Sequence, residues 1–259
     1  MQGVASRSFT AEFVPPATSE ENSSDRHILN EYYRVLSVAM GPMNWWPGRT
    51  RFEVIVGAIL TQNTAWTNVE RALANLRRSR LLSPRAIEEF PEKRLALLIR
   101  PSGYFRQKAR KLKAFVHFLR RDYDGSLTKM FRTPTPDLRS KLLSVHGIGR
   151  ETADSILLYA GKHAVFVVDA YTHRIMERHG LSGGKGDYEA TRAFFEGNIP
   201  RKVQIYNEFH ALLVNVGKSW CRPREPRCGE CPLRVHLPTH SPLRIANTPS
   251  SFASQESCR

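Results

Sequence analysis

The chain has 259 residues, of which 41% are hydrophobic and 24% charged, and its formal net charge is +15. This length can bury one large or two small cores, and the composition is that of a soluble globular protein. No run of 18 apolar residues occurs, which argues against a membrane span. The first residues also lack the charged and apolar regions of a secretory signal.

The positive charge is concentrated in one part of the chain. Residues 71–121 contain 15 Lys or Arg and three acids, a surplus of 12 out of the total of +15. Such a concentration favours a polyanionic partner that is bound in a salt-dependent way. A solvated helix face would account for the same charges, so the charge alone leaves both interpretations open.

The first predicted helix follows a polar tail. Residues 1–26 are acidic, contain Ser, Thr and Pro, and show no periodicity, which predicts a disordered tail. From about Arg26 onward, apolar residues recur on one helical face, and we expect this helix to end at Gly41 and Pro42.

The loop MNWWPG comes next and carries Trp45, Trp46 and Pro47. Tryptophan side chains most often fill a protein core. Adjacent indoles in a loop can instead form a platform on which a planar base stacks. The sequence leaves both interpretations open.

The rest of the chain alternates helical patterns with turns. Arg51–Leu60 has the apolar spacing of a buried helix, and a second helix is expected through Trp66. Further helices are predicted at 84–90, at 93–99, through 109–119, from 175 to Gly180, at 187–197 and at 200–218, with a loop at 182–186. No strand pattern occurs, so the predicted fold is all-α.

A helix, a glycine hairpin and a second helix are predicted within residues 138–161. Gly147 and Gly149 bracket Ile148, and the second helix begins at about Arg150 in the sequence GIGRETAD. A glycine hairpin before a helix start presents free backbone N–H groups and the positive end of the helix dipole. This segment is therefore a candidate anion site.

A single carboxylate, Asp169, ends the apolar run AVFVVD 20 residues after Gly149. A carboxylate held beside a phosphate-binding hairpin indicates chemistry on a nucleic acid. The alternative is an ordinary role as the N-cap of the following helix.

Taken together, GIGRETAD and VVDAYTHR closely resemble the helix-hairpin-helix, Gly/Pro-rich-loop, Asp superfamily of DNA glycosylases, of which endonuclease III is the type member. The resemblance implies an all-α, two-lobed endonuclease III-like fold. By it, residues 49–163 form a six-helix barrel containing the helix-hairpin-helix at 138–161, residues 27–48 and 164–220 form the second lobe, residues 221–237 form a cysteine loop, and residues 238–259 form a disordered tail. It also implies a monomer that excises damaged bases from double-stranded DNA in the cleft between the lobes, in the cytoplasm at a bacterial nucleoid.

The same resemblance implies roles for single residues. Asp169 would stabilise the oxocarbenium-like transition state of glycosidic cleavage and orient the attacking water. Gln62, beside Asn63 in ILTQNTAW, would fill the gap that the extruded base leaves, although both residues could simply cap helices. Contacts to the DNA backbone are expected at Lys108 and at the hairpin residues Gly147, Ile148, Gly149 and Arg150.

Glu151 departs from the endonuclease III pattern. The hairpin of that enzyme reads GVGRKTA, and its lysine forms a Schiff base with the sugar, whereas here the frame reads GIGRETA. A carboxylate cannot form an imine, so the resemblance implies a monofunctional glycosylase. Among the members that lack this lysine, the 3-methyladenine glycosylases look most similar, which implies a cationic alkylated purine attracted to indole rings. The expected base pocket consists of Trp45, Trp46, Pro47, Trp66 and Lys218.

Two other functions stay open at this stage. One is an endonuclease III-type enzyme for oxidised pyrimidines, whose lyase step would use another amine. The other is a noncatalytic helix-hairpin-helix module that binds DNA and in which Asp169 is vestigial.

Three clustered cysteines follow the last helix with the spacing C-x6-C-x2-C: Cys221, Cys228 and Cys231. Clustering favours metal ligation in a reducing compartment over disulfides. Endonuclease III continues with x5-C and binds a 4Fe–4S cluster through four thiolates, so the resemblance implies a possible cluster here. The fourth position is Leu237, which cannot ligate iron. A fourth ligand from His236, Cys258 or an exogenous group, a zinc site and a metal-free loop all stay open.

Overall fold

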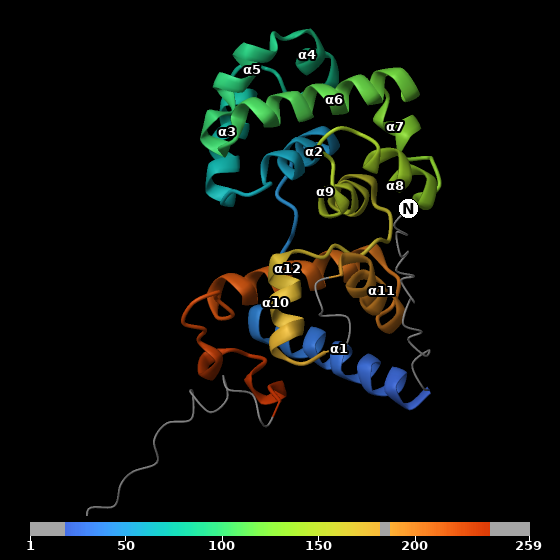
Figure 1. The fold of residues 1–259 in the computed structure, drawn as a ribbon, viewed down its shortest axis with the longest axis vertical. Helices are drawn as coiled ribbons and strands as arrows, with labels where there is room; N and C mark the ends of the chain where they lie inside the picture. The colour runs from blue at the N-terminus through green and yellow to red at the C-terminus, as the bar shows by residue number, and fades with distance from the viewer. Residues whose placement is uncertain (1–18, 182–186, 239–259) are drawn as a thin grey trace, which may run out of the picture.

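The chain folds into two helical lobes joined by two linkers (Figure 1). The computed structural model describes residues 19–181 and 187–238, and every regular element among them is a helix. The expected all-α fold is therefore confirmed. None of these described helices is long and apolar enough to cross a membrane.

The first lobe runs from α2 to the short π-helix η2. Its elements are α2 Arg51–Leu60, α3 Trp66–Arg78, α4 Pro84–Glu89, α5 Glu92–Leu98, η1 Arg100–Ser102, α6 Phe105–Tyr123, α7 Leu127–Met130, α8 Thr135–Leu143, α9 Arg150–Ser155 and η2 Ile156–Gly161. Helix α2 contacts α3, α6, α9 and η2, and nine of its ten residues are buried. A helix that is apolar on nearly all sides belongs at the centre of such a lobe.

A buried lysine forms a hydrogen bond to the C-terminal end of α2. The Lys108 side chain is 1% exposed, and its ammonium donates hydrogen bonds to the carbonyl oxygens of Leu60 at 2.9 Å and Ser102 at 2.6 Å. Burial, together with the charge of Lys111, lowers the pKa of Lys108 to about 8. The prediction that Lys108 contacts a DNA phosphate is therefore corrected, because the ammonium is used inside the lobe.

The first helix is longer than the sequence pattern predicted. Helix α1 spans Ser19–Met40, so it begins seven residues before Arg26, and the predicted tail 1–26 is too long. The rest of that tail, the predicted loop 182–186 and the tail from 239 onward, with Cys258, lie outside the described residues.

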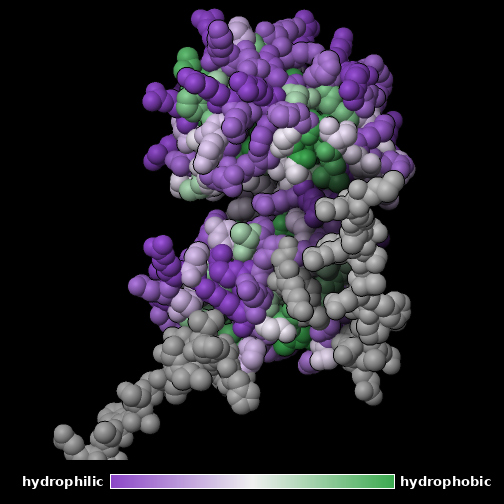
Figure 2. Space-filling view, in the orientation of Figure 1, coloured by the Kyte–Doolittle hydropathy of each residue, from purple (hydrophilic) through white to green (hydrophobic). Residues whose placement is uncertain are grey.

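The second lobe consists of α1 and the elements that follow Asp169. These are α10 Ala170–Arg178, α11 Tyr188–Asn198, α12 Val203–Ser219, η3 Cys228–Glu230 and η4 Arg234–His236. Helix α12 packs against α1 and α10, and α1 also packs against α11. Residues 41–50 and 162–169 connect the lobes (Figure 1). Figure 2 shows that the outline of the molecule narrows at this junction.

Candidate active site

Asp169 lies where the second linker enters α10. Its carboxylate accepts hydrogen bonds from the Thr172 backbone N–H at 2.8 Å and from the Thr172 hydroxyl at 2.9 Å, so it is the N-cap of α10. Burial acts to raise the pKa of Asp169, but the adjacent His210 ring and the Thr172 donors outweigh it and bring this pKa below its ordinary value. The carboxylate is therefore ionised at neutral pH.

The same carboxylate also lines a cavity of about 520 Å³ between the lobes. This volume is in the range of small-molecule sites. The rings of Trp45, Trp46 and Trp66 line it, with centroids of Trp46 and Trp66 5.1 Å apart and those of Trp45 and Trp46 5.6 Å apart. The functional groups around it come from Asn63, Glu151, Asp169, His210 and Lys218. The cavity thus combines an aromatic wall with two carboxyl groups.

The other two predicted pocket residues, Pro47 and Lys218, lie in different places relative to the cavity. Pro47 is exposed and does not line the cavity, so its placement in the base pocket is corrected; the chain turns outward after Trp46. Lys218, at the end of α12, does line the cavity, and its ammonium lies 5.6 Å from the centre of the Trp45 ring. An indole face in this cavity is therefore already positioned to attract a cation.

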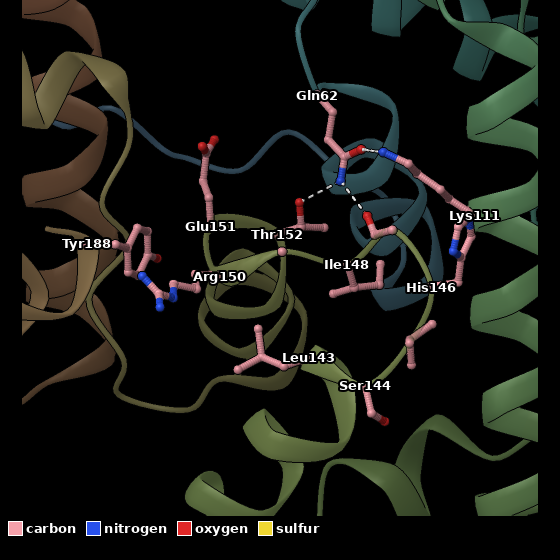
Figure 3. A pocket seen from close by; sticks show the side chains of 13 residues that line it. Gln62, Lys111, Leu143, Ser144, His146, Ile148, Arg150, Glu151, Thr152 and Tyr188 are labelled. Atoms are coloured by element: carbon pink, nitrogen blue, oxygen red, sulfur yellow. Dashed lines mark hydrogen bonds between the residues drawn. The ribbon is translucent and has the colours of Figure 1, made fainter. Parts of the chain in front are cut away.

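Glu151 lies in the first turn of α9 and lines the cavity together with Asp169. Figure 3 shows its carboxyl group pointing away from the glycine hairpin. The residue is exposed to solvent within the cleft, whose walls surround its carboxyl group. The resulting desolvation, together with the negative charge of Asp169, raises the pKa of Glu151 to about 7.

The glycine hairpin lines a separate, open concave surface next to this cavity. The space that this surface partly encloses has a volume of about 740 Å³. Gly147 has a φ of +79°, and a side chain there would collide with the aliphatic stem of Lys111. The Ile148 side chain is buried, which leaves the hairpin backbone and the exposed Arg150 on the surface. The concave surface is thus lined by Gly147, Ile148, Gly149 and Arg150, as well as by Gln62 and Lys111.

Gln62 makes three hydrogen bonds, one of them to the hairpin (Figure 3). Its amide group donates to the Gly147 carbonyl at 3.0 Å and to the Thr152 hydroxyl at 2.8 Å, and it accepts from the Lys111 ammonium. It therefore caps no helix. Asn63 is exposed and lies at the edge of the tryptophan cavity.

Two residues that the sequence did not single out belong to the cavity region. His210 of α12 lines the cavity, and its Nε2 atom lies 3.6 Å from the Asp169 carboxylate. Tyr159 of η2 bonds to the other ring nitrogen of His210 at 2.5 Å. Tyr159 lies within the helix-hairpin-helix segment but was not singled out, and His210 belongs to no motif, because both occur among apolar residues of buried helical segments.

The cysteine loop is fixed to α10 by two arginines. Arg174 donates to the Cys221 carbonyl at 2.7 Å, and Arg178 donates to the carbonyl oxygens of Arg222 at 2.7 Å and Pro223 at 3.2 Å. Arg178 also reaches the Cys221 sulfur at 3.3 Å. These hydrogen bonds from α10 hold the start of the cysteine loop in place.

The residues of this loop do not fit a 4Fe–4S cluster held by four protein ligands. All three thiols are buried in one narrow pocket, and Leu237 forms part of its wall. His236 does not line that pocket, because its ring packs 5.2 Å from the ring of Tyr32, so His236 as fourth ligand is corrected. Among the described residues, no group of His, Cys, Asp or Glu side chains is arranged to hold a metal ion.

Restoring the missing thiol tests this assignment. We expect the natural chain, purified anaerobically and reconstituted with iron and sulfide, to bind no stable cluster. We expect Leu237→Cys to acquire the visible absorbance and full iron complement of a 4Fe–4S protein, because it recreates four thiolates at the required spacing.

A matched control is Val235→Cys, which adds a thiol at an exposed position of the same loop, outside the pocket. It should stay colourless. Full iron occupancy of the natural chain would instead show that Cys258 or an exogenous group supplies the fourth ligand.

The chain is similar to known DNA repair proteins over most of its length. The profile of the HhH-GPD superfamily of base excision DNA repair proteins matches residues 56–201. A putative DNA repair glycosylase of Methanocaldococcus jannaschii is 45% identical over 209 residues, which cover 80% of this chain and 94% of that protein. Endonuclease III of Thermotoga maritima is 29% identical over 185 residues, which cover 71% of this chain and 81% of that enzyme.

Solved structures show the same fold. The H. pylori 3-methyladenine DNA glycosylase bound to 1,N6-ethenoadenine superposes with a TM-score of 0.66 at 30% identity, covering 75% of this chain and 97% of that one. A non-covalent complex of endonuclease III with DNA gives a TM-score of 0.71 at 22% identity, covering 87% of this chain and 98% of that one. The expected endonuclease III-like fold is therefore confirmed.

Proposed function

The chain belongs to the HhH-GPD superfamily of base excision DNA repair proteins, and we propose that it is a monofunctional glycosylase for a cationic alkylated purine such as 3-methyladenine. That it is a DNA glycosylase follows from the family and from its relatives. The choice of base and the absence of a lyase step are the parts that we propose.

One observation carries the proposal: the Asp169 carboxylate and three indole rings line the same cavity. A base must leave the duplex stack before its glycosidic bond can be cut. The bond then breaks through an oxocarbenium-like transition state, which an ionised carboxylate stabilises. An N3-methylated adenine is itself cationic, so it leaves without a general acid, and indole faces attract it.

Glu151 supports the monofunctional part of the proposal. It lies at the cavity in the position where the endonuclease III pattern has its lysine. A carboxyl group cannot form the imine that backbone cleavage by β-elimination requires. The product would be an abasic site in an unbroken strand.

We expect the hairpin side of the cleft to bind the DNA backbone. We propose that the backbone of Gly147 to Gly149 and the side chain of Arg150 hold the strand that carries the lesion. Gln62 and Asn63 lie between the hairpin surface and the tryptophan cavity, where the position emptied by the base would be. In this arrangement the lobes, 49–163 and 27–48 with 164–220, would face the DNA from two sides.

A substrate panel tests the proposal. The protein is incubated with methylated duplex DNA and, separately, with a duplex that carries thymine glycol, and the released bases are separated by chromatography. We expect release of 3-methyladenine and none of thymine glycol. With borohydride present during turnover, we expect no covalent enzyme–DNA adduct, because Glu151 replaces the Schiff-base lysine and the Lys218 ammonium lies against the Trp45 ring.

Glu151→Lys is the matched variant for the borohydride step, because it puts an amine at the same place in the cavity wall. This variant should give an adduct where the natural chain gives none. Release of thymine glycol with an adduct from the natural chain would identify an enzyme for oxidised pyrimidines instead. If neither base is released, the proposed substrate is wrong, and the panel is extended to duplexes with mismatched or deaminated bases.

A further inference from the structure

His210 has an unusual environment for a buried histidine. Its side chain, on α12, is about as buried as the residues of the core, with 5% of the residue exposed. The Nδ1 atom bonds to the Tyr159 hydroxyl at 2.5 Å. The Nε2 atom has no hydrogen-bond partner within the usual distance, yet it faces the Oδ2 atom of Asp169 at 3.6 Å. A buried polar atom aimed at a carboxylate in a cavity calls for a function.

The bond from Tyr159 determines which nitrogen of His210 carries the proton. Burial raises the pKa of Tyr159 well above its ordinary value, so the hydroxyl stays protonated and can donate. When it donates to Nδ1, the ring is neutral and its own hydrogen is on Nε2, directed at Asp169. The Tyr159 ring also packs on Trp46 with centroids 4.9 Å apart, which keeps the hydroxyl in place.

We propose that His210, oriented by Tyr159, is a positioning residue that holds the Asp169 carboxylate ionised and aimed into the cavity. Thr172 binds the Oδ1 atom of this carboxylate, and His210 faces the Oδ2 atom, so the two together fix its orientation. In the tautomer that accepts from Tyr159 the ring carries no charge, so the negative charge of Asp169 stays available to a developing sugar cation. This inference rests on the proposed glycosylase function and adds a residue to its site.

The charged surroundings decide the direction of the pH effect. The titratable or charged groups that face this pair from the neighbouring elements are Glu151 of α9, Tyr159 of η2, Tyr171 of α10 and Lys218 of α12. Glu151 carries the same charge as Asp169 and opposes its ionisation, as does burial. His210 is the main group that lowers the pKa of Asp169, so its loss should raise that pKa.

Two substitutions of His210 separate positioning from packing. His210→Phe keeps a planar ring but removes both nitrogens, whereas His210→Gln keeps an N–H donor at about the reach of Nε2. We expect His210→Phe to lower kcat for base release by roughly 10- to 100-fold with little change in KM, the range for a hydrogen bond to a charged group. The acid limb of its pH–rate profile should move to higher pH, because the group that lowers the pKa of Asp169 is lost. His210→Gln should restore most of the kcat and most of the natural pH–rate profile. Tyr159→Phe should give values between those of the two His210 variants.

A measurement without DNA makes the outcome independent of the substrate. In protein labelled with ¹³C at aspartate carboxyl groups, the Asp169 signal is assigned by its loss in Asp169→Asn and then titrated. We expect this carboxyl to titrate at higher pH in His210→Phe than in the natural chain, with His210→Gln near the natural value. If the natural chain releases no base, the proposed function fails and the titration alone decides the inference. An unchanged titration in a folded His210→Phe protein would overturn it.

Discussion

Asp169→Asn is expected to reduce the rate of base release by about 10²- to 10³-fold, the loss typical of removing one group that stabilises transition-state charge. The fold should be unaffected. An asparagine side chain accepts the same hydrogen bonds from Thr172, and Asn caps a helix as well as Asp does. What the substitution removes is the negative charge at the cavity. Single-turnover release from methylated duplex, with a thermal melt of each protein, measures the two effects separately.

Asp187→Asn provides a matched control for this prediction. Asp187 is also an N-cap aspartate: it begins α11 and accepts from the Glu189 backbone N–H at 3.0 Å. It is exposed and lines none of the cavities around Asp169. If Asp169 acts only as a cap, both variants should release base at the natural rate. That result, with normal binding to duplex DNA, would remove the catalytic role.

The candidate site could be predicted from the sequence where a local motif carried the information. Trp45, Trp46 and Trp66 line one cavity with Asp169, as the resemblance to the glycosylases suggested. His210 could not be found in this way. It lies 41 residues after Asp169 in an apolar helix, and only the packing of α12 against the start of α10 brings the two together.

The prediction for Lys108 failed for a different reason, because the sequence did contain the pattern that indicates burial. Lys108 is four residues before Leu112 and seven before Phe115, so all three lie on one helical face. That face is the buried side of α6. The positive charge of the segment suggested DNA contact, whereas helical spacing indicated burial. The ammonium is buried at acceptable cost because two carbonyl groups accept its hydrogen bonds.

The longer helices were predicted from the periodicity of apolar residues, whereas the way they join and pack was not. The bounds of α2 agree with the prediction to the residue, because turn residues and a Thr50 cap delimit its apolar pattern. The π-helical turn η2 could not be predicted, since its residues are apolar in every direction and fit any helical period. How the two lobes are held together was also absent from the pattern, because the ion pairs between them join residues far apart in the chain.

Arg139 forms one such ion pair, and its loss should destabilise the fold. Its guanidinium binds both carboxylate oxygens of Asp154 at 2.7 and 3.0 Å, and it also binds Glu189 of α11 at 2.8 Å. Asp154 is fully buried on α9, so Arg139 links the helix-hairpin-helix to the second lobe. Arg139→Met would leave that carboxylate with a hydrogen bond from Tyr188 alone. The expected cost is about 3–5 kcal/mol of unfolding free energy.

A thermal melt should show this cost as a decrease in Tm on the order of 10 °C. Arg85→Met is the control, because the Arg85–Glu89 pair is exposed on α4 and should leave Tm unchanged. Adding Asp154→Asn to Arg139→Met should recover part of the loss, since it removes the stranded charge and keeps an acceptor for Tyr188. An Arg139→Met protein as stable as the natural chain would mean that α11 is held to the hairpin by apolar packing. In that case the distance between the hairpin and Asp169 would not depend on this ion pair.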